Sequence, residues 1–172
     1  MAQPLQMYMH RAFRFPRVFG AVFITRKVLQ MQTHRILLVD DCHLVLKSLG
    51  PLLESKGYQV TAVDNGADAA SLINQRNFDI VIAEIQLKAL TGIEVFYEVK
   101  KVRPGTTIIL LTGTGDTTPF INILRPDADD FLLKPFEPEE IFFRIKRCIE
   151  IRNLKKEATL KLAGYAKNPD RR

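Results

Sequence analysis

The sequence has few cysteines and no long apolar run, and both absences narrow the class of protein. Its 172 residues include only two cysteines, Cys42 and Cys148, which lie far apart and have no histidine at metal-ligand spacing. This spacing favours two free thiols in a reducing compartment, and hence the cytoplasm, over a disulfide framework or a zinc site. No apolar stretch approaches the ~18 residues of a membrane span.

Acidic residues are absent from the first 33 positions, and this absence changes how the net charge of +6 is interpreted. Residues 1–33 carry five basic side chains, residues 151–172 carry seven basic and two acidic ones, and residues 34–150 carry thirteen basic and seventeen acidic ones. The positive charge thus belongs to the two ends. We predict a basic N-terminal extension with little fold of its own over 1–33, a domain over 34–150, and a basic helical extension over 151–172.

The middle of the chain alternates β-rich runs with helical stretches, the pattern of repeated βα units around a parallel sheet. Strands are expected at 36–39, 58–62, 78–83, 107–111 and 131–133. The runs at 36–39 and 78–83 are almost wholly apolar, which is typical of strands covered on both faces. The pattern predicts an α/β fold, a flavodoxin-like doubly wound sheet of five parallel strands in the order 2-1-3-4-5, with helices on both faces.

Helices are expected after the strands, at 44–53, 66–76, 92–102, 116–125 and from Glu137 onward through Leu162. Gly50-Pro51 should bend or interrupt the first helix, because proline removes a backbone donor and crowds the preceding turn. In the last helix the spacing of apolar residues predicts an inward face. That face comprises Ile141, Phe142, Ile145 and Ile149.

Polar residues stand where the predicted strands end. They are Asp40 and Asp41 after the first strand, Glu84 after the third, Thr112 after the fourth and Lys134 after the fifth. In such a sheet these ends face the ligand crevice. Three carboxylates in one pocket repel one another unless a cation or a proton compensates them. Carboxylate oxygens suit Mg²⁺, and a hydroxyl with an ammonium suits the oxygens of a phosphoryl group.

Five motifs in register make the sequence recognisable. They are Asp40-Asp41 after ILLV, the run FDIVIAE ending at Glu84, Gly92 eight residues on, Thr112 after IILL, and DDFLLKPF around Lys134. Over about residues 34–150 the chain resembles the receiver domain of two-component response regulators, the CheY-like family. A flavodoxin-like domain with acids at its strand ends by chance is the alternative, and five motifs in order argue against it.

The resemblance implies a role for each of these positions. Glu84 stands at the phosphoacceptor position, and Thr112 and Lys134 would bind the oxygens of the phosphoryl group. Asp40, Asp41 and Glu84, with the backbone carbonyl of Gln86, would hold Mg²⁺. Thr112 and Phe131 would form the conformational switch, in which the aromatic ring turns inward as the hydroxyl moves.

Position 84 departs from the family pattern, in which an aspartate accepts phosphate from a histidine kinase. Glu84 adds a methylene, which displaces the nucleophilic oxygen by more than about an ångström in a site where such misplacement can cost ~10²-fold in rate. We expect Glu84 either to imitate the phosphorylated state or to leave the pocket inert. A working Mg²⁺-dependent phosphoacceptor is the alternative. A second departure is Lys88, which stands where the family usually has proline.

These features predict a stand-alone regulator that is not an enzyme, since only about twenty residues follow position 150, too few for an effector module. It would act on a protein partner: a sensor histidine kinase, a phosphotransfer protein or a downstream effector. The C-terminal extension would be solvated overhang, a short homodimer contact or a remnant linker. A hypothesis of another class is that the basic ends bind nucleic acid or a membrane surface; the ends carry no RNA-binding motif, which argues against it.

Overall fold

The computed structural model describes residues 33–88, 90–113 and 128–167. The predictions of an N-terminal extension and of a helix at 116–125 fall outside these residues. Within the described part, none of the helices is long and apolar enough to cross a membrane.

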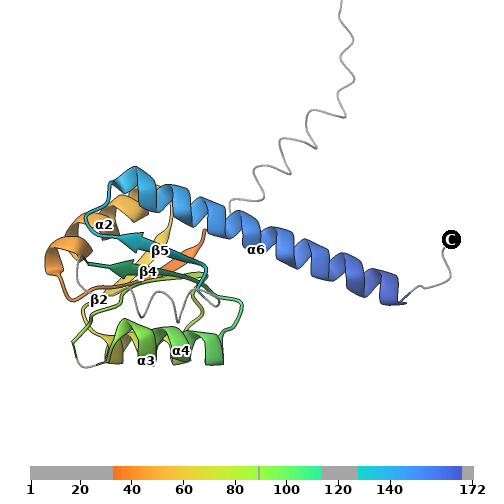
Figure 1. Ribbon diagram of the computed structural model, residues 1–172, viewed down its shortest axis with the longest axis horizontal. Coiled ribbons are helices and arrows are strands. Elements are labelled where there is room, and N and C mark those ends of the chain that lie inside the picture. Colours follow the sequence, from red (N-terminus) through yellow and green to blue (C-terminus); the bar gives the residue numbers. More distant parts are fainter. Residues whose placement is uncertain (1–32, 89, 114–127, 168–172) are drawn as a thin grey trace, which may run out of the picture. The chain divides into compact units, whose positions relative to one another are not determined.

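Five parallel strands form one sheet in the order β2-β1-β3-β4-β5. The strands are β1 (Arg35–Val39), β2 (Gln59–Val63), β3 (Ile80–Glu84), β4 (Thr107–Thr112) and β5 (Asp130–Leu133). The described helices are α2 (His43–Ser55), α3 (Gly66–Gln75), α4 (Gly92–Val102) and α6 (Pro138–Lys167). The predicted flavodoxin-like topology is confirmed, and α3 and α4 cover one face of the sheet while α2 and α6 lie on the other (Figure 1).

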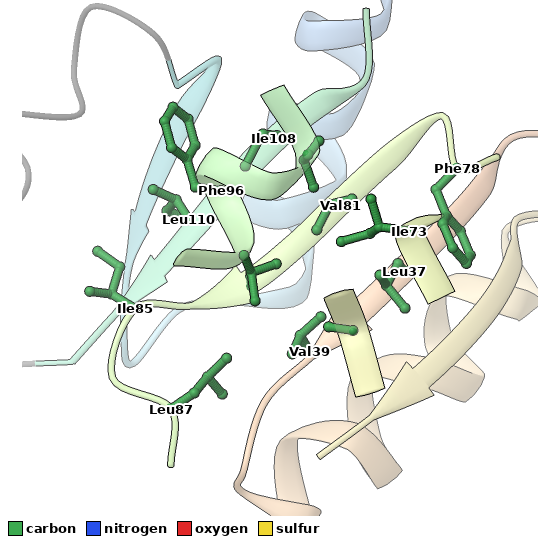
Figure 2. Packing of buried hydrophobic residues seen from close by; sticks show 14 residues of the cluster. Leu37, Val39, Ile73, Phe78, Val81, Ile85, Leu87, Phe96, Ile108 and Leu110 are labelled. Atoms are coloured by element: carbon green, nitrogen blue, oxygen red, sulfur yellow. The ribbon is translucent and has the colours of Figure 1, made fainter. Parts of the chain in front are cut away.

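Each strand of the sheet's centre sends alternate side chains to opposite faces, because the side-chain period of a strand is two residues. Leu37 and Val39 of β1 pack toward α3 and α4, whereas Ile36 and Leu38 pack toward α2 and α6. Figure 2 shows the first of these clusters, in which sheet residues such as Leu37 meet the helix side chains. Burial on both faces explains why the central strands are continuous apolar runs.

Helix α2 corrects one sequence-based prediction, because the chain stays helical through Gly50 and Pro51. The proline ring is exposed, and it removes only one hydrogen bond of the helix. On the opposite side, Leu49 and Leu53 are buried against the sheet. Burial of two leucines on either side of the proline therefore holds the helix across the break that its sequence predicts.

Helix α6 begins with Pro138 and the acids Glu139 and Glu140, as expected at the positive end of a helix dipole. Of its predicted inward residues, Ile141 and Ile145 are fully buried. Phe142 and Ile149 are half-buried and pack at the edge of the same cluster. Cys148, which the sequence did not place inside, is buried there too. The predicted continuation of the helix through Leu162 is confirmed, and the helix goes on to Lys167.

Candidate functional site

The carboxyl edge of the sheet brings together the side chains that follow its central strands. The register pairs Val39 with Ala83 and Glu84 with Leu111, so Asp40, Glu84 and Thr112 end their strands at the same level. All three are buried, with exposed fractions of 0%, 6% and 2%. Parallel strands that end together place their last side chains around one crevice, and the predicted convergence is confirmed for these positions.

Lys134 connects two of the buried acids. Its Nζ lies 2.5 Å from Asp40 Oδ2 and 2.6 Å from Glu84 Oε2. The lysine is itself fixed from its backbone, whose N–H donates to the Thr112 carbonyl at 2.7 Å. One ammonium thus compensates two buried carboxylates, which would otherwise repel each other in a medium of low dielectric constant.

Burial alone would lower the pKa of Lys134, since it disfavours the charged form. The hydrogen bonds to Asp40 and Glu84, together with their negative charges, outweigh that effect and raise the pKa of Lys134 above its ordinary value. The ammonium is therefore charged throughout the physiological pH range, and it is committed to both carboxylates.

The remaining oxygens of the two acids bind nearby backbone groups. Asp40 Oδ1 accepts from the N–H of Cys42 at 2.9 Å, and Glu84 Oε1 accepts from the N–H of Gln86 at 3.1 Å. Each carboxylate therefore has one oxygen on the lysine and the other on the loop that follows its own strand. Such pairing of both oxygens is what makes a buried ionised carboxylate tolerable.

The backbone around Glu84 is held closely by the start of α4. The N–H of Gly92 donates to the Ile85 carbonyl at 3.0 Å, and a Cβ at position 92 would overlap the carbonyl of Glu84. Helix α4 itself starts with a capping box, in which Thr91 and Glu94 bind each other's backbone N–H groups. Because Gly92 has no side chain, the start of α4 can lie against the main chain of Glu84 and hold it in place. This close approach is a physical reason for a glycine eight residues after Glu84.

Asp41 does not join this cluster. Its side chain is half-buried, and its Oδ2 lies 3.9 Å from the Nζ of Lys88. Lys88 is thus a member of the site that sequence reasoning noticed only as a departure from the family. At that distance and exposure the pair is worth little, so Asp41 keeps the character of an accessible carboxylate at the rim.

The sequence of the domain matches a known family. The family model described as response regulator receiver domain matches residues 36–146. The chain belongs to the response regulator receiver family. It is therefore a receiver domain of two-component signalling.

The chain is also similar in sequence to named transcriptional regulatory proteins. The chain is 32% identical over 115 residues to the transcriptional regulatory protein GlrR of Escherichia coli (strain K12), covering 67% of this chain and 26% of GlrR. It is 32% identical over 136 residues to the transcriptional regulatory protein DltR of Streptococcus agalactiae serotype III (strain NEM316), covering 79% of this chain and 61% of DltR. The chain thus spans less than two thirds of the length of either relative.

Solved structures of receiver domains resemble this chain over nearly the whole of their own length. A response regulator receiver domain from Clostridium thermocellum has a TM-score of 0.65 and 28% identity, covering 70% of this chain and 98% of its own. A CheY-like receiver domain from Methanospirillum hungatei JF-1 has a TM-score of 0.66 and 28% identity, covering 71% of this chain and 98% of its own.

The predicted switch residues, Thr112 and Phe131, differ in burial. Thr112 ends β4 fully buried, and its hydroxyl donates to the Gly113 carbonyl at 3.3 Å. Phe131 on β5 pairs in register with Leu110 and packs, half-buried, against the cluster under α3 and α4. The ring is thus turned partly inward, and a switching role for these two residues stays a prediction.

Receiver domains typically bind Mg²⁺ at the phosphorylation site, and Asp40, Asp41 and Glu84 supply the oxygen atoms that this ion prefers. Their arrangement does not fit the ion, however. Lys134 already occupies one oxygen of both buried carboxylates, and within the described ranges no three His, Cys, Asp or Glu side chains gather closely enough to hold a metal. The Lys134 ammonium already supplies a positive charge beside Asp40 and Glu84.

A cleft of about 750 Å³ lies at the amino end of β4, away from the carboxylates at the other end of the strands. It is lined by the start of β4 and by α6, and its charged residues are Lys100, Asp129, Arg152, Lys155 and Lys156. Lys100 forms an ion pair with Asp129 at 3.3 Å. Within the part of the chain that the structure describes, Lys155 and Lys156 have no such partner. The cleft is therefore net basic and shares no residue with the acidic site.

Proposed function

We propose that this receiver domain is a regulator whose output does not depend on phosphorylation, and that the Glu84–Lys134 ion pair takes the place of the phosphorylated residue. It acts in the cytoplasm by binding a protein partner of two-component signalling, a histidine kinase, a phosphotransfer protein or an effector, and it is not an enzyme. The observation that carries the proposal is the 2.6 Å contact between Glu84 Oε2 and Lys134 Nζ.

Two features of the site argue against phosphoryl transfer to Glu84. In-line transfer needs the attacking oxygen in a defined place, and both oxygens of Glu84 are bound, one by Lys134 and one by the N–H of Gln86. Transfer also places more negative charge on the site, and the ammonium that would stabilise it is already shared with Asp40. The longer side chain of Glu84 thus reaches the contact that a phosphoryl oxygen would make.

The first experiment tests phosphorylation directly. The full chain and its Glu84→Asp and Glu84→Ala variants are incubated with a small-molecule phosphodonor and Mg²⁺, and their intact masses are measured. We expect no phosphoryl adduct on the native chain and a stoichiometric adduct on Glu84→Asp. An adduct on the native chain that disappears in Glu84→Ala would instead establish the alternative, a working phosphoacceptor that uses Glu84.

The second experiment separates imitation of the phosphorylated state from an inert pocket. Amide chemical shifts are recorded for the native chain and for Glu84→Asp before and after phosphorylation. If Glu84 imitates the phosphorylated state, the native shifts near Thr112 and Phe131 lie closer to those of the phosphorylated variant. Shifts that coincide with those of the unphosphorylated variant would mean that the pocket is inert.

The basic cleft supports one alternative function, the binding of a polyanion such as duplex DNA through its phosphates. Lys155 and Lys156 project from α6 without acidic partners among the described residues, and such cations bind phosphates with an affinity that falls steeply with salt. Fluorescence anisotropy with a labelled duplex tests this alternative in the full chain. Binding that is lost on Lys155→Glu and Lys156→Glu, and that weakens as salt is raised, would support it; binding unchanged by both substitutions would exclude the cleft.

A further inference from the structure

The basic cleft lies between one face of α6 and the segment 104–107 at the start of β4. The residues that α6 contributes recur at spacings of three and four, which keeps them on one side of the helix. They are Ile151, Arg152, Lys155, Lys156, Thr159 and Leu160. Figure 1 shows this part of α6 running past the sheet. The protruding helix and the amino end of β4 thus enclose a hollow.

Two cations of the basic cleft serve the fold. Lys100 Nζ lies 3.3 Å from Asp129 Oδ2, which also accepts from the N–H of Ile108 at 2.9 Å. Arg152 donates to the backbone carbonyl of Asp79 at 2.7 Å and to its carboxylate at 3.3 Å. The negative charge of Asp129 is therefore offset within the protein, so it opposes an anion in the cleft only weakly.

Lys155 and Lys156 are the cations that remain for a ligand. Both line the cleft and are exposed, and neither forms an ion pair with any residue that the structure describes. An ammonium binds phosphate as a point charge. On the same face, Ile151 and Leu160 are 40% and 73% exposed and add apolar surface. The volume of about 750 Å³ falls within the range of small-molecule sites, about 300–1,000 Å³.

We propose that the basic cleft binds a small phosphorylated molecule with a flat apolar part, such as a nucleotide. Its phosphates would lie on Lys155 and Lys156, and its base against Ile151 and Leu160. A mononucleotide exposes its base to such apolar contacts, whereas the bases of a duplex are stacked inside it. The proposal does not rest on the state of Glu84, so it holds or fails independently of the phosphorylation-independent output proposed above.

Calorimetric titration of the full chain with ATP, pyrophosphate and adenosine tests the ligand class. EDTA is present, so that no metal-bound nucleotide binds at the acidic site. ATP should bind saturably and about tenfold more tightly than pyrophosphate or adenosine, because it alone uses both parts of the cleft. No saturable binding of ATP, or equally tight binding of pyrophosphate, would overturn the proposal. A DNA duplex that binds more tightly than ATP through the same lysines would overturn it in favour of the alternative above.

Neutral variants test the phosphate contacts. Lys155→Gln and Lys156→Gln should each weaken the binding of ATP by about five- to tenfold. The matched control is Lys146→Gln, which removes the same charge from the same helix at an exposed position. Lys146 lies nine residues before Lys155, about half a turn around α6, and should leave the affinity unchanged. Equal losses in all three variants would mean that only the net charge acts, which would overturn the site.

Leu160→Ser tests the apolar contact. It should weaken the binding of ATP severalfold and leave that of pyrophosphate unchanged, since pyrophosphate has no apolar part. Leu154→Ser is the control, because Leu154 is 64% exposed on the same helix but does not line the cleft. Circular dichroism checks that each variant is folded. If Leu160→Ser left the affinity for ATP unchanged, the proposed position of the base would be wrong.

His34 reports where the phosphates lie. Burial lowers the pKa of His34, and the positive charges of Arg152 and Lys156 lower it further, against the effect of Asp79. Phosphates on Lys156 would offset part of that positive charge, so bound ATP should raise the pKa of His34. NMR titration of the ring protons with and without saturating ATP measures the shift. A pKa of His34 that does not move would place the ligand elsewhere and overturn the proposal.

Discussion

Lys134 reaches across β4 to bind Glu84, so that its ammonium lies 2.6 Å from an oxygen of a strand that is not its neighbour in the sheet. The same ammonium binds Asp40, which follows β1. One side chain thus ties the ends of three strands together over the carboxyl edge. The first prediction concerns what happens when this ammonium is removed.

Replacing Lys134 with methionine should destabilise the domain by about 3–5 kcal/mol near neutral pH, because two buried carboxylates lose their counter-ion. Because the pKa of Lys134 is raised, the native contribution should persist through neutral pH and be lost only as pH rises through its folded-state pKa, above 10.5. Urea unfolding of the native chain and of the variant across pH measures both effects.

The control for this variant is Lys88→Met. Lys88 is 87% exposed and lies 3.9 Å from Asp41, so its removal should change the free energy of unfolding by less than about 1 kcal/mol. If the two substitutions cost the same, the Lys134 ion pairs contribute no more than a surface pair.

Gly92→Ala should destabilise the domain by about 1–3 kcal/mol, since the new methyl group would overlap the Glu84 carbonyl and displace either α4 or β3. Gly50→Ala is the matched comparison, because a Cβ there meets no atom within 4 Å. This second variant should stabilise α2 by about 0.5–1 kcal/mol, the difference in helix propensity between the residues. Thermal unfolding measures the stability of both variants. If both substitutions stabilised the domain, the close contact between Gly92 and the Glu84 carbonyl would be contradicted.

The two cysteines should differ sharply in reactivity. Cys42 is exposed, whereas burial raises the pKa of the Cys148 thiol to about 11. Because the thiolate is the reactive form, a maleimide at neutral pH should label Cys42 rapidly and Cys148 only after unfolding. Peptide mapping after timed labelling identifies the site. Equal labelling rates in the folded chain would mean that the α6 interface opens readily.

Histidine 34 should titrate below the ordinary value of 6.5, because burial lowers the pKa of His34 and the positive charges of Arg152 and Lys156 add to that effect against Asp79. The folded domain therefore favours the neutral ring, and this contribution to stability is present above pH 6.5 and lost as pH falls through the lowered pKa. NMR titration of the ring protons measures the midpoint. Arg152→Gln should move it upward, and a midpoint that stays in place would exclude the charge of Arg152 as a cause.

The fold was predictable from sequence because burial on both faces leaves continuous apolar strands, and the βα alternation restricts the topology. The convergence of Asp40, Glu84 and Lys134 was predictable for the same reason, since parallel strands end at one edge. What the sequence did not indicate is how the side chains divide among partners. Lys134 binds two acids while Asp41 turns to Lys88, and such choices depend on side-chain geometry that no residue pattern records.

The helix through Gly50-Pro51 and the burial of Cys148 were missed for a related reason. Local propensity favours a break at proline, but the burial of Leu49 and Leu53 outweighs it. Cys148 occupies a helix position whose inward direction depends on the exact placement of α6 against β5. Contacts between segments distant in sequence therefore decided both outcomes.

The length of α6 gives the molecule a mechanical property of its own. The helix is anchored on the sheet up to Arg152, and the fifteen residues that follow extend for about 22 Å at ~1.5 Å per residue. A tilt of about 10° at the anchored end would carry the far end through about 4 Å. Lys134 follows β5, the strand that leads into α6. Small rearrangements beside Lys134 would thus produce larger displacements at the far end of this helix.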